Sequence, residues 1–190
     1  NKFPHLSIKV LEGDLRYVSK LVANGESDVA LSYDLGLPEG SVFEAMGEAR
    51  PHAVFSADDP LAKAKSVSMT DLARRPMILL DLPESRTYFE LLFRTFNLTP
   101  NVLFRTSTYQ TLRSFVSIGL GFSILNLRPS TDFANTGEKV VCVPIQETLP
   151  APSVGVYWHG DVHKSPAALA FIEICRELYA SPRGQRHFVT

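Results

Sequence analysis

The chain has 190 residues, of which 45% are hydrophobic and 21% charged, and its formal net charge is −1. This composition is typical of a globular protein and excludes a disordered chain, a collagen and a coiled coil. The charge balance provides no basic field that would hold a nucleic acid, so we expect no DNA binding by these residues alone. No apolar run approaches the roughly 18 residues that span a membrane, and we expect a cytoplasmic protein.

The first predicted unit is strand–helix–strand. Apolar and polar residues alternate over 6–10, which predicts a half-buried strand. Asp14 is placed to cap a helix that ends at Asn24-Gly25, and a short buried strand follows over 28–32. Two strands joined through a helix are typical of a parallel sheet.

The remaining chain continues this alternation. Ser107 and Gln110 match the capping-box pattern at a helix start, and Ser165-Pro166 predicts the start of the last helix. A short helix is expected after Ser68, and another is expected to run to Phe96. Strands are expected near 41–48, 52–56, 77–80, 102–104, 121–125, 140–143 and 154–158. Together these elements predict an α/β protein with parallel sheets.

Motifs for catalysis, nucleotides and metals are missing from the sequence. Gly119-Leu120-Gly121 lacks the third glycine of a dinucleotide loop and precedes a strand. The histidines and aspartate over 159–163 have metal-capable spacing, but Gly160 weakens a helix there and a solvated loop is favoured. Cys142 and Cys175 lie in apolar runs, which indicates buried reduced thiols; a disulfide between them is poorly motivated. We predict neither an enzyme nor a cofactor.

The carboxyl ends of the predicted strands are the candidate ligand site. In open α/β sheets, ligands bind in the crevice outside these ends. Three of the four ends lead directly into helices, whose free N–H groups favour an anionic ligand such as a carboxylate. Capping explains the serine and threonine hydroxyls equally well. The candidate residues are Gly13, Asp14, Tyr33, Leu82, Pro83, Ser85, Ser107 and Thr108.

Five segments in order resemble the effector-binding domain of LysR-type transcriptional regulators. Residues 3–13 (FPHLSIKVLEG) are similar to the family's F-P-x-V-x-L-x-L-x-E-G. The other four are 21–31 (LVANGESDVAL), 59–62 (DPLA), 67–72 (VSMTDL) and 117–125 (SIGLGFSIL). After the last of them the chain has Asn126 where the family usually has proline.

The resemblance implies a periplasmic-binding-protein-like fold of type 2, with two Rossmann-like lobes and a small-molecule cleft between them. One lobe would comprise residues 1–56 and 157–190 and the other 57–156, with crossings near 53–57 and 156–160. Family members carry a strand and a helix before the position of Phe3-Pro4, and a helix-turn-helix domain further upstream. The chain starts at Asn1 without them, so DNA would be bound only through that absent domain.

The resemblance also implies a homodimer, with a tetramer left open for the full-length protein. Strand 6–11 and helix 15–24 of one copy would lie near helix 108–118 of the other. The expected partner is a small organic effector, with Tyr33 placed to stack on an aromatic one. Asp14 would repel a carboxylate, so either the ligand is zwitterionic or Asp14 is only a cap. The alternatives are a transporter's solute-binding protein and, less favoured, an enzyme on the same scaffold.

Overall fold

The computed structural model describes residues 7–161 and 163–188 and divides the chain into two units. Unit 1 consists of the residues up to Glu48 together with Pro152–Gly184. Unit 2 consists of Ala49–Ala151 together with the residues from Gln185 onward. The chain therefore passes from one unit to the other three times.

The division differs from the lobes expected from the resemblance. Strand β3 (His52–Ser56) pairs along its length with strands of unit 2, and strand β8 (Ser153–His159) pairs with strands of unit 1. Three segments therefore lie in the other unit from the one expected, namely residues 49–56, residues 152–156 and the residues from 185 onward. Backbone pairing decides this, because the N–H and C=O groups of a buried strand must find partners in one sheet.

Unit 1 contains a three-stranded sheet in the order β1-β8-β2, with both pairings antiparallel. The outer strands are β1 (Ala30–Tyr33) and β2 (Ser41–Glu48). A Cβ on Gly155, in the middle strand, would collide with the Glu44 carbonyl oxygen. A glycine is therefore required where β2 and β8 approach so closely.

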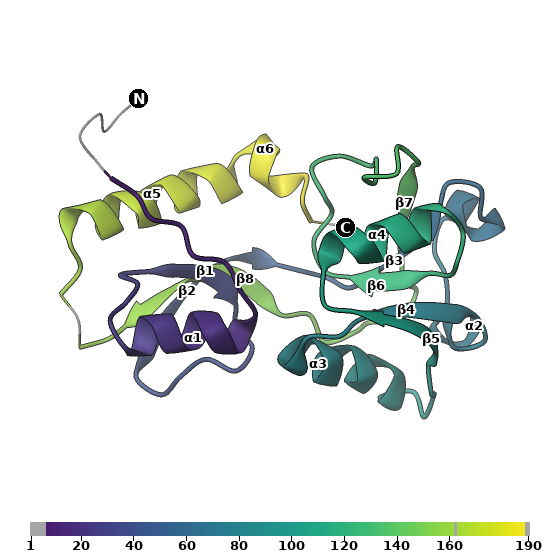
Figure 1. Cartoon of the computed structure of the whole chain (residues 1–190), viewed down its shortest axis with the longest axis horizontal. Helices are drawn as coiled ribbons and strands as arrows, with labels where there is room; N and C mark the ends of the chain where they lie inside the picture. The colour runs from purple at the N-terminus through teal and green to yellow at the C-terminus, as the bar shows by residue number, and fades with distance from the viewer. Residues whose placement is uncertain (1–6, 162, 189–190) are drawn as a thin grey trace. The chain divides into compact units, whose positions relative to one another are not determined.

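Two helices cover the faces of this sheet, α1 (Leu15–Ala23) on one side and α5 (Pro166–Ala180) on the other (Figure 1). Val22 of α1 packs on Ala30 and Tyr157, whereas Ile172 of α5 packs on Val156. The predicted caps of both helices are confirmed: the Asp14 side chain accepts from Tyr17 N at 2.8 Å, and Ser165 Oγ accepts from Ala168 N at 3.1 Å. A short helix, α6 (Pro182–Gln185), follows α5.

The strand predicted over 6–10 is not formed in its described part. Residues 7–14 have no regular secondary structure, and Ile8 and Val10 are 67% and 73% exposed; residue 6 lies outside the described residues. The strand–helix–strand unit is therefore wrong for this part of the chain. Alternation alone does not make a strand, because the backbone also needs a neighbouring edge to pair with. Among the described residues, β1 pairs only with β8.

Unit 2 contains a larger sheet, built from an antiparallel set β6-β3-β7 and a parallel pair β4-β5. A parallel bridge between Met77 and Phe122 joins the two sets, and Ile78 N donates to Phe122 O at 2.8 Å. The strands besides β3 are β4 (Pro76–Leu80), β5 (Asn101–Thr106), β6 (Ser123–Leu125) and β7 (Val140–Pro144). The expectation of parallel pairing therefore holds for β4 and β5, while the strands of unit 1 pair antiparallel.

The helices of unit 2 follow its strands, and their bounds are η1 (Pro60–Lys63), α2 (Met69–Ala73), α3 (Pro83–Arg94) and α4 (Tyr109–Ser117). Leu112 and Val116 of α4 are fully buried against Val54 and Ile78 of the sheet. The N-cap of α4 is Thr108, so the predicted cap at Ser107 is wrong by one residue. Serine and threonine are both common N-cap residues, so residue type alone does not decide between Ser107 and Thr108.

The two cysteines are free thiols, Cys175 buried in unit 1 and Cys142 half-buried in unit 2. Burial raises the pKa of Cys142 to about 11 and also raises that of Cys175. Neither thiol is therefore activated for nucleophilic chemistry. No helix in the described part of the chain is long and apolar enough to cross a bilayer.

Candidate ligand site

The carboxyl ends of β4 and β5 lie side by side in unit 2. Leu80 is in register with Thr106, and Asp81 N donates to Thr106 O at 2.8 Å just beyond the last pair. Helices α3 and α4 begin within three residues of these ends. The structure therefore brings together five of the sequence-predicted site residues at one edge of the sheet: Leu82, Pro83, Ser85, Ser107 and Thr108.

The two helices at this edge begin without a side-chain cap. Leu82 and Thr108 occupy the N-cap positions of α3 and α4, and neither side chain accepts a hydrogen bond from its helix backbone. By contrast, the caps Asp14, Ser68 and Ser165 all do so in α1, α2 and α5. The N–H groups in the first turns of these helices, to which Pro83 contributes none, therefore have no side-chain acceptor at the N-cap, and the helix dipoles there favour an anionic group.

The hydroxyl groups at this edge differ in their present partners. Thr108 Oγ1 donates to Thr111 Oγ1 at 2.7 Å, so its lone pairs remain available as acceptors. The side chains of Ser85 and Ser107 make no hydrogen bond to the described residues, and Ser107 is exposed. Ser85 lies in the first turn of α3 and does not cap it. These hydroxyls are free to bind a polar ligand.

A charged group that the sequence analysis did not select lies at the same edge. Asp81 follows β4 and forms ion pairs with Arg86 of α3 and, at 3.8 Å, with Arg105 of β5. Each pair is partly exposed and contributes at most about 1 kcal/mol to stability. Their effect is positional, because two guanidinium groups are held near the strand ends. The position of Asp81, a charged residue directly after the apolar strand β4, is the feature of the sequence that could have indicated it.

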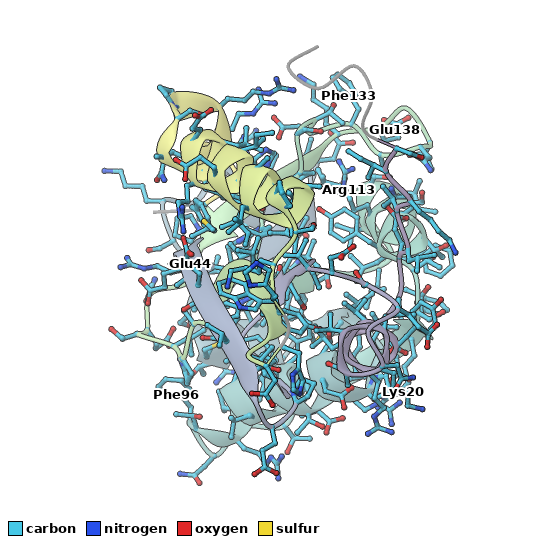
Figure 2. All side chains as sticks on the ribbon, turned by 90° about the vertical axis from the view of Figure 1, so that its left-hand side faces the viewer. Lys20, Glu44, Phe96, Arg113, Phe133 and Glu138 are labelled. Atoms are coloured by element: carbon cyan, nitrogen blue, oxygen red, sulfur yellow. The ribbon has the colours of Figure 1, made fainter. Side chains whose placement is uncertain are left out.

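Arg113 of α4 connects this helix to the loop over 127–139. It is a buried residue whose guanidinium donates to the carbonyl oxygens of Thr131, at 2.7 Å, and Phe133, at 2.9 Å. Figure 2 labels Arg113 and Phe133. The guanidinium also lies 5.7 Å from the ring centroid of Tyr109, the first residue of α4. Burial raises the pKa of Tyr109 to about 12. These contacts fix the start of α4 and the loop over 127–139 against each other.

Unit 1 contains the three other predicted residues. Gly13 is exposed and precedes α1, Asp14 caps that helix, and Tyr33 is the last residue of β1, half-buried and paired with Val154. The hydrogen bond from Tyr17 N accounts for the position of the Asp14 carboxylate. Capping is thus the role that the contacts of Asp14 support.

The described residues contain no group of three or more histidine, cysteine, aspartate or glutamate side chains that could hold a metal ion. His159 Nδ1 instead accepts a hydrogen bond from Asp161 N at 3.4 Å, within a turn that follows β8. This local contact agrees with the loop favoured for this segment.

Comparison with known proteins decides the family. The family model described as "LysR substrate binding domain" matches residues 1–180. The chain belongs to this family. It is the effector-binding domain of a LysR-type transcriptional regulator, and this family is not one of enzymes. The five motif segments therefore identified the family correctly.

Several relatives agree with this assignment. The C-terminal domain of a probable LysR family regulator from Rhodococcus sp. RHA1 is 35% identical, with a TM-score of 0.85, over 92% of this chain and 86% of that one. HinK, a LysR family regulator from Pseudomonas aeruginosa, is 32% identical, with a TM-score of 0.86, over 94% and 62%. YnfL of Escherichia coli, an uncharacterized HTH-type regulator, is 27% identical over 89% of this chain and 57% of its own length. The chain thus spans little more than half of that curated relative.

Two more distant structures bear on the fold alone. The effector-binding domain of QuiR, solved with shikimate, is 20% identical with a TM-score of 0.74. That of BenM, solved with its effector benzoate, is 17% identical with a TM-score of 0.75. The likeness confirms the predicted fold class, an α/β fold of the periplasmic-binding-protein type 2.

Proposed function

We propose that this chain is the ligand-sensing and dimerising part of a cytoplasmic LysR-type regulator, and that its effector is a small organic molecule bearing a carboxylate. One observation carries the proposal: α3 and α4 start uncapped at the paired ends of β4 and β5. Their N–H groups, with the hydroxyls of Ser85, Ser107 and Thr108, suit a carboxylate. Shikimate and benzoate, bound by the distant relatives, are both small carboxylates.

The proposal also keeps the three predicted site residues of unit 1. Tyr33 has an aromatic ring at the end of β1 that can stack on an aromatic effector. Gly13 precedes α1 and lies against the Tyr17 ring, where a Cβ would come within 2.3 Å of Cδ1. In this proposal Asp14 only caps α1, through the hydrogen bond from Tyr17 N, and does not contact the ligand. Effector binding favours one arrangement of the units, and this preference is a coupling free energy with DNA binding.

DNA binding itself belongs to a helix-turn-helix domain outside this chain. The net charge of −1 gives these residues no general affinity for the phosphate backbone. The HTH-type relative, of which the chain matches only 57%, supports a longer regulator. A transporter's solute-binding protein would share the fold, but the family match to a regulator domain disfavours it.

Dimerisation is supported by apolar side chains that the single chain leaves exposed. Those in the expected pairing are Ile8, Val10 and Tyr17 in unit 1, between 45% and 73% exposed, and Leu103, Phe104, Ile118 and Leu120 in unit 2, on β5 and at the end of α4. Other apolar side chains are exposed as well, among them Leu169, Ile174 and Leu178 of α5. We propose that the surface of unit 1 meets that of unit 2 in a second copy. A twofold axis then buries each surface twice.

Calorimetry tests the ligand site. A panel of small carboxylates that includes shikimate and benzoate is titrated into the chain, and the tightest binder is then titrated into Thr108→Ala and Tyr33→Ala. The loss of one neutral hydrogen bond in Thr108→Ala weakens binding by ~0.5–1.5 kcal/mol. Thr70→Ala, an exposed threonine of α2, is the matched control and leaves affinity unchanged. Unchanged affinity in both site variants, with the fold intact, would place the site elsewhere.

A further inference from the structure

Asn126, the residue that departs from the family motif, is buried directly after β6 and is 6% exposed. Its side-chain nitrogen donates two hydrogen bonds, to Ala49 O at 2.8 Å and to Tyr88 Oη at 2.9 Å. A primary amide has two N–H groups, so both are used. The proline of the family motif has no side-chain donor and could make neither bond.

Tyr88 of α3 extends this network. Its hydroxyl accepts from Asn126 and donates to Pro150 O at 2.8 Å, and the residue is 8% exposed. Burial raises the pKa of Tyr88 to about 12, so the donor is retained at neutral pH. A continuous chain of hydrogen bonds therefore runs from the carbonyl of Ala49 through Asn126 and Tyr88 to the carbonyl of Pro150.

These two carbonyls lie where the chain passes between the units. Ala49 is the first residue of unit 2 after β2, and Pro150 is the next-to-last before the chain returns to β8. The third passage follows Gly184 and is bound by Arg128, which lies two residues after Asn126 in the sequence. Arg128 N donates to His187 O at 2.7 Å, and His187 Nδ1 lies 2.9 Å from Arg128 O.

We propose that residues 126–128, together with Tyr88, form a junction that holds all three chain passages to unit 2 and sets how freely the two units move. The three passages are far apart in the sequence, and this short segment collects them by direct hydrogen bonds. Breaking one bond of the junction loosens the passages first and leaves the sheet of unit 2 intact.

The junction also has a link to the ligand site. Tyr88 lies in α3, the helix whose first turn contains Pro83 and Ser85. If the proposed function is correct, a ligand that shifts the start of α3 also shifts the hydroxyl that holds the Pro150 carbonyl. The junction is then a positioning device, and its residues need not touch the ligand.

Hydrogen exchange followed by mass spectrometry tests the junction without any ligand, so its outcome is independent of the proposed effector site. Tyr88→Phe removes the bond to Pro150 O and keeps the ring. Exchange over 148–154 then becomes about threefold to tenfold faster, as expected for the loss of one buried hydrogen bond in a local opening. Asn126→Ala produces the same acceleration over 46–52 as well as over 148–154.

Two controls distinguish a local effect at the junction from a general loss of stability. Tyr109→Phe removes the hydroxyl of a half-buried tyrosine of unit 2 and leaves both passages at the wild-type rate. A peptide covering β4, over 76–81, keeps its protection in every variant. Unchanged exchange over 148–154 in Tyr88→Phe, or acceleration over 76–81 to the same degree, overturns the proposal.

Discussion

The two units differ in how completely each buries its apolar residues. Among the described residues, the largest side chains that are fully buried all lie in unit 2, with Tyr157 as the exception. Over residues 7–161 and 163–188, unit 2 builds its core on five connected strands, whereas unit 1 has three strands and β1 lies at the edge of their sheet. Unit 1 also leaves Ile8 and Val10 exposed in the irregular segment before α1.

The difference shows that an α/β unit depends on its sheet being complete. A buried strand supplies both backbone partners and an apolar face, so a missing neighbour exposes both at once. In the described residues, the strands of unit 2 pair with one another across five strands, whereas β1 of unit 1 pairs on one side only, with β8. We therefore expect the two units to respond differently to the same kind of substitution.

The largest effect is expected from truncation of the unit 2 core. Leu112 of α4 is fully buried against the sheet, so Leu112→Ala lowers the free energy of unfolding of unit 2 by about 2–5 kcal/mol. Trp158, the single tryptophan, lies in unit 1, so its fluorescence reports that unit alone, while far-UV circular dichroism reports both. Urea denaturation followed by both signals measures the response of each unit.

We expect the Trp158 transition to change by less than about 0.5 kcal/mol in Leu112→Ala, because the substituted residue lies in the other unit. Leu169→Ala, on the half-exposed side of α5, is the control and leaves both transitions nearly unchanged. Equal shifts of fluorescence and dichroism would show that the units unfold as one, and the comparison would fail.

The second prediction concerns pH and again affects unit 2. His52 of β3 is fully buried, and this burial lowers its pKa from 6.5 to about 4. The unfolded state therefore binds a proton at a higher pH than the folded state does. The stabilising contribution is complete above about pH 6.5 and is lost as the pH falls toward 4, in total about 3 kcal/mol.

Urea denaturation at pH 7 and at pH 4.5 measures this loss. In His52→Gln the part of the pH dependence that belongs to His52 disappears, so the difference between the two pH values becomes smaller than in the wild type. His163→Gln, at an exposed position of unit 1, is the matched control and retains the full dependence. An identical pH dependence in His52→Gln and the wild type would contradict the assignment.

The sequence predicted most elements of unit 2 because its strands find partners within the chain. The bounds of β3 were predicted to the residue, as were those of β2 in unit 1. The alternation of strands and helices predicted parallel sheets, and the structure has parallel pairing between β4 and β5. In unit 1 the same rules failed at 6–10, where the pattern was present without a neighbouring edge. Periodicity reports which face of a segment is apolar, and pairing depends on a second segment.

The candidate site was predictable only in its local part. Strand ends and helix starts are local signals, and they placed Ser107 and Thr108 at one helix start and Pro83 at the other. The groups that the sequence did not reveal depend on distant pairing. Asn126 meets Ala49 across 77 positions and Tyr88 across 38, distances along the chain at which no local pattern operates.

The third prediction tests whether a second copy covers the apolar surfaces. Ile118→Asp in unit 2 and Val10→Asp in unit 1 each place a charge in the proposed interface. Burying a charge without a partner opposes association, so each variant weakens the dimer by ~1–3 kcal/mol, a dissociation constant about five- to 200-fold higher. Sedimentation velocity over a range of concentrations measures this constant.

The control is Leu169→Asp, on a half-exposed part of α5 outside both surfaces. It leaves the dimer at wild-type strength. A wild-type chain that sediments as a monomer at high micromolar concentration would remove the proposed dimer altogether. An effect of Leu169→Asp as large as that of Ile118→Asp would move the interface to α5.

The smallest effect is expected at Asp14. Its carboxylate either only caps α1 or also acts on the ligand through its charge, and two substitutions separate these roles. Its Oδ1 accepts from Tyr17 N at the start of α1, so Asp14→Ala lowers the stability of unit 1 by ~1 kcal/mol, seen in the Trp158 transition. Asp14→Asn keeps an equally good cap and removes the charge. If Asp14 is only a cap, Asp14→Asn retains both wild-type stability and wild-type affinity for the carboxylate found by calorimetry. A change of affinity in Asp14→Asn, with the Trp158 transition unchanged, would instead show that the charge acts on the ligand.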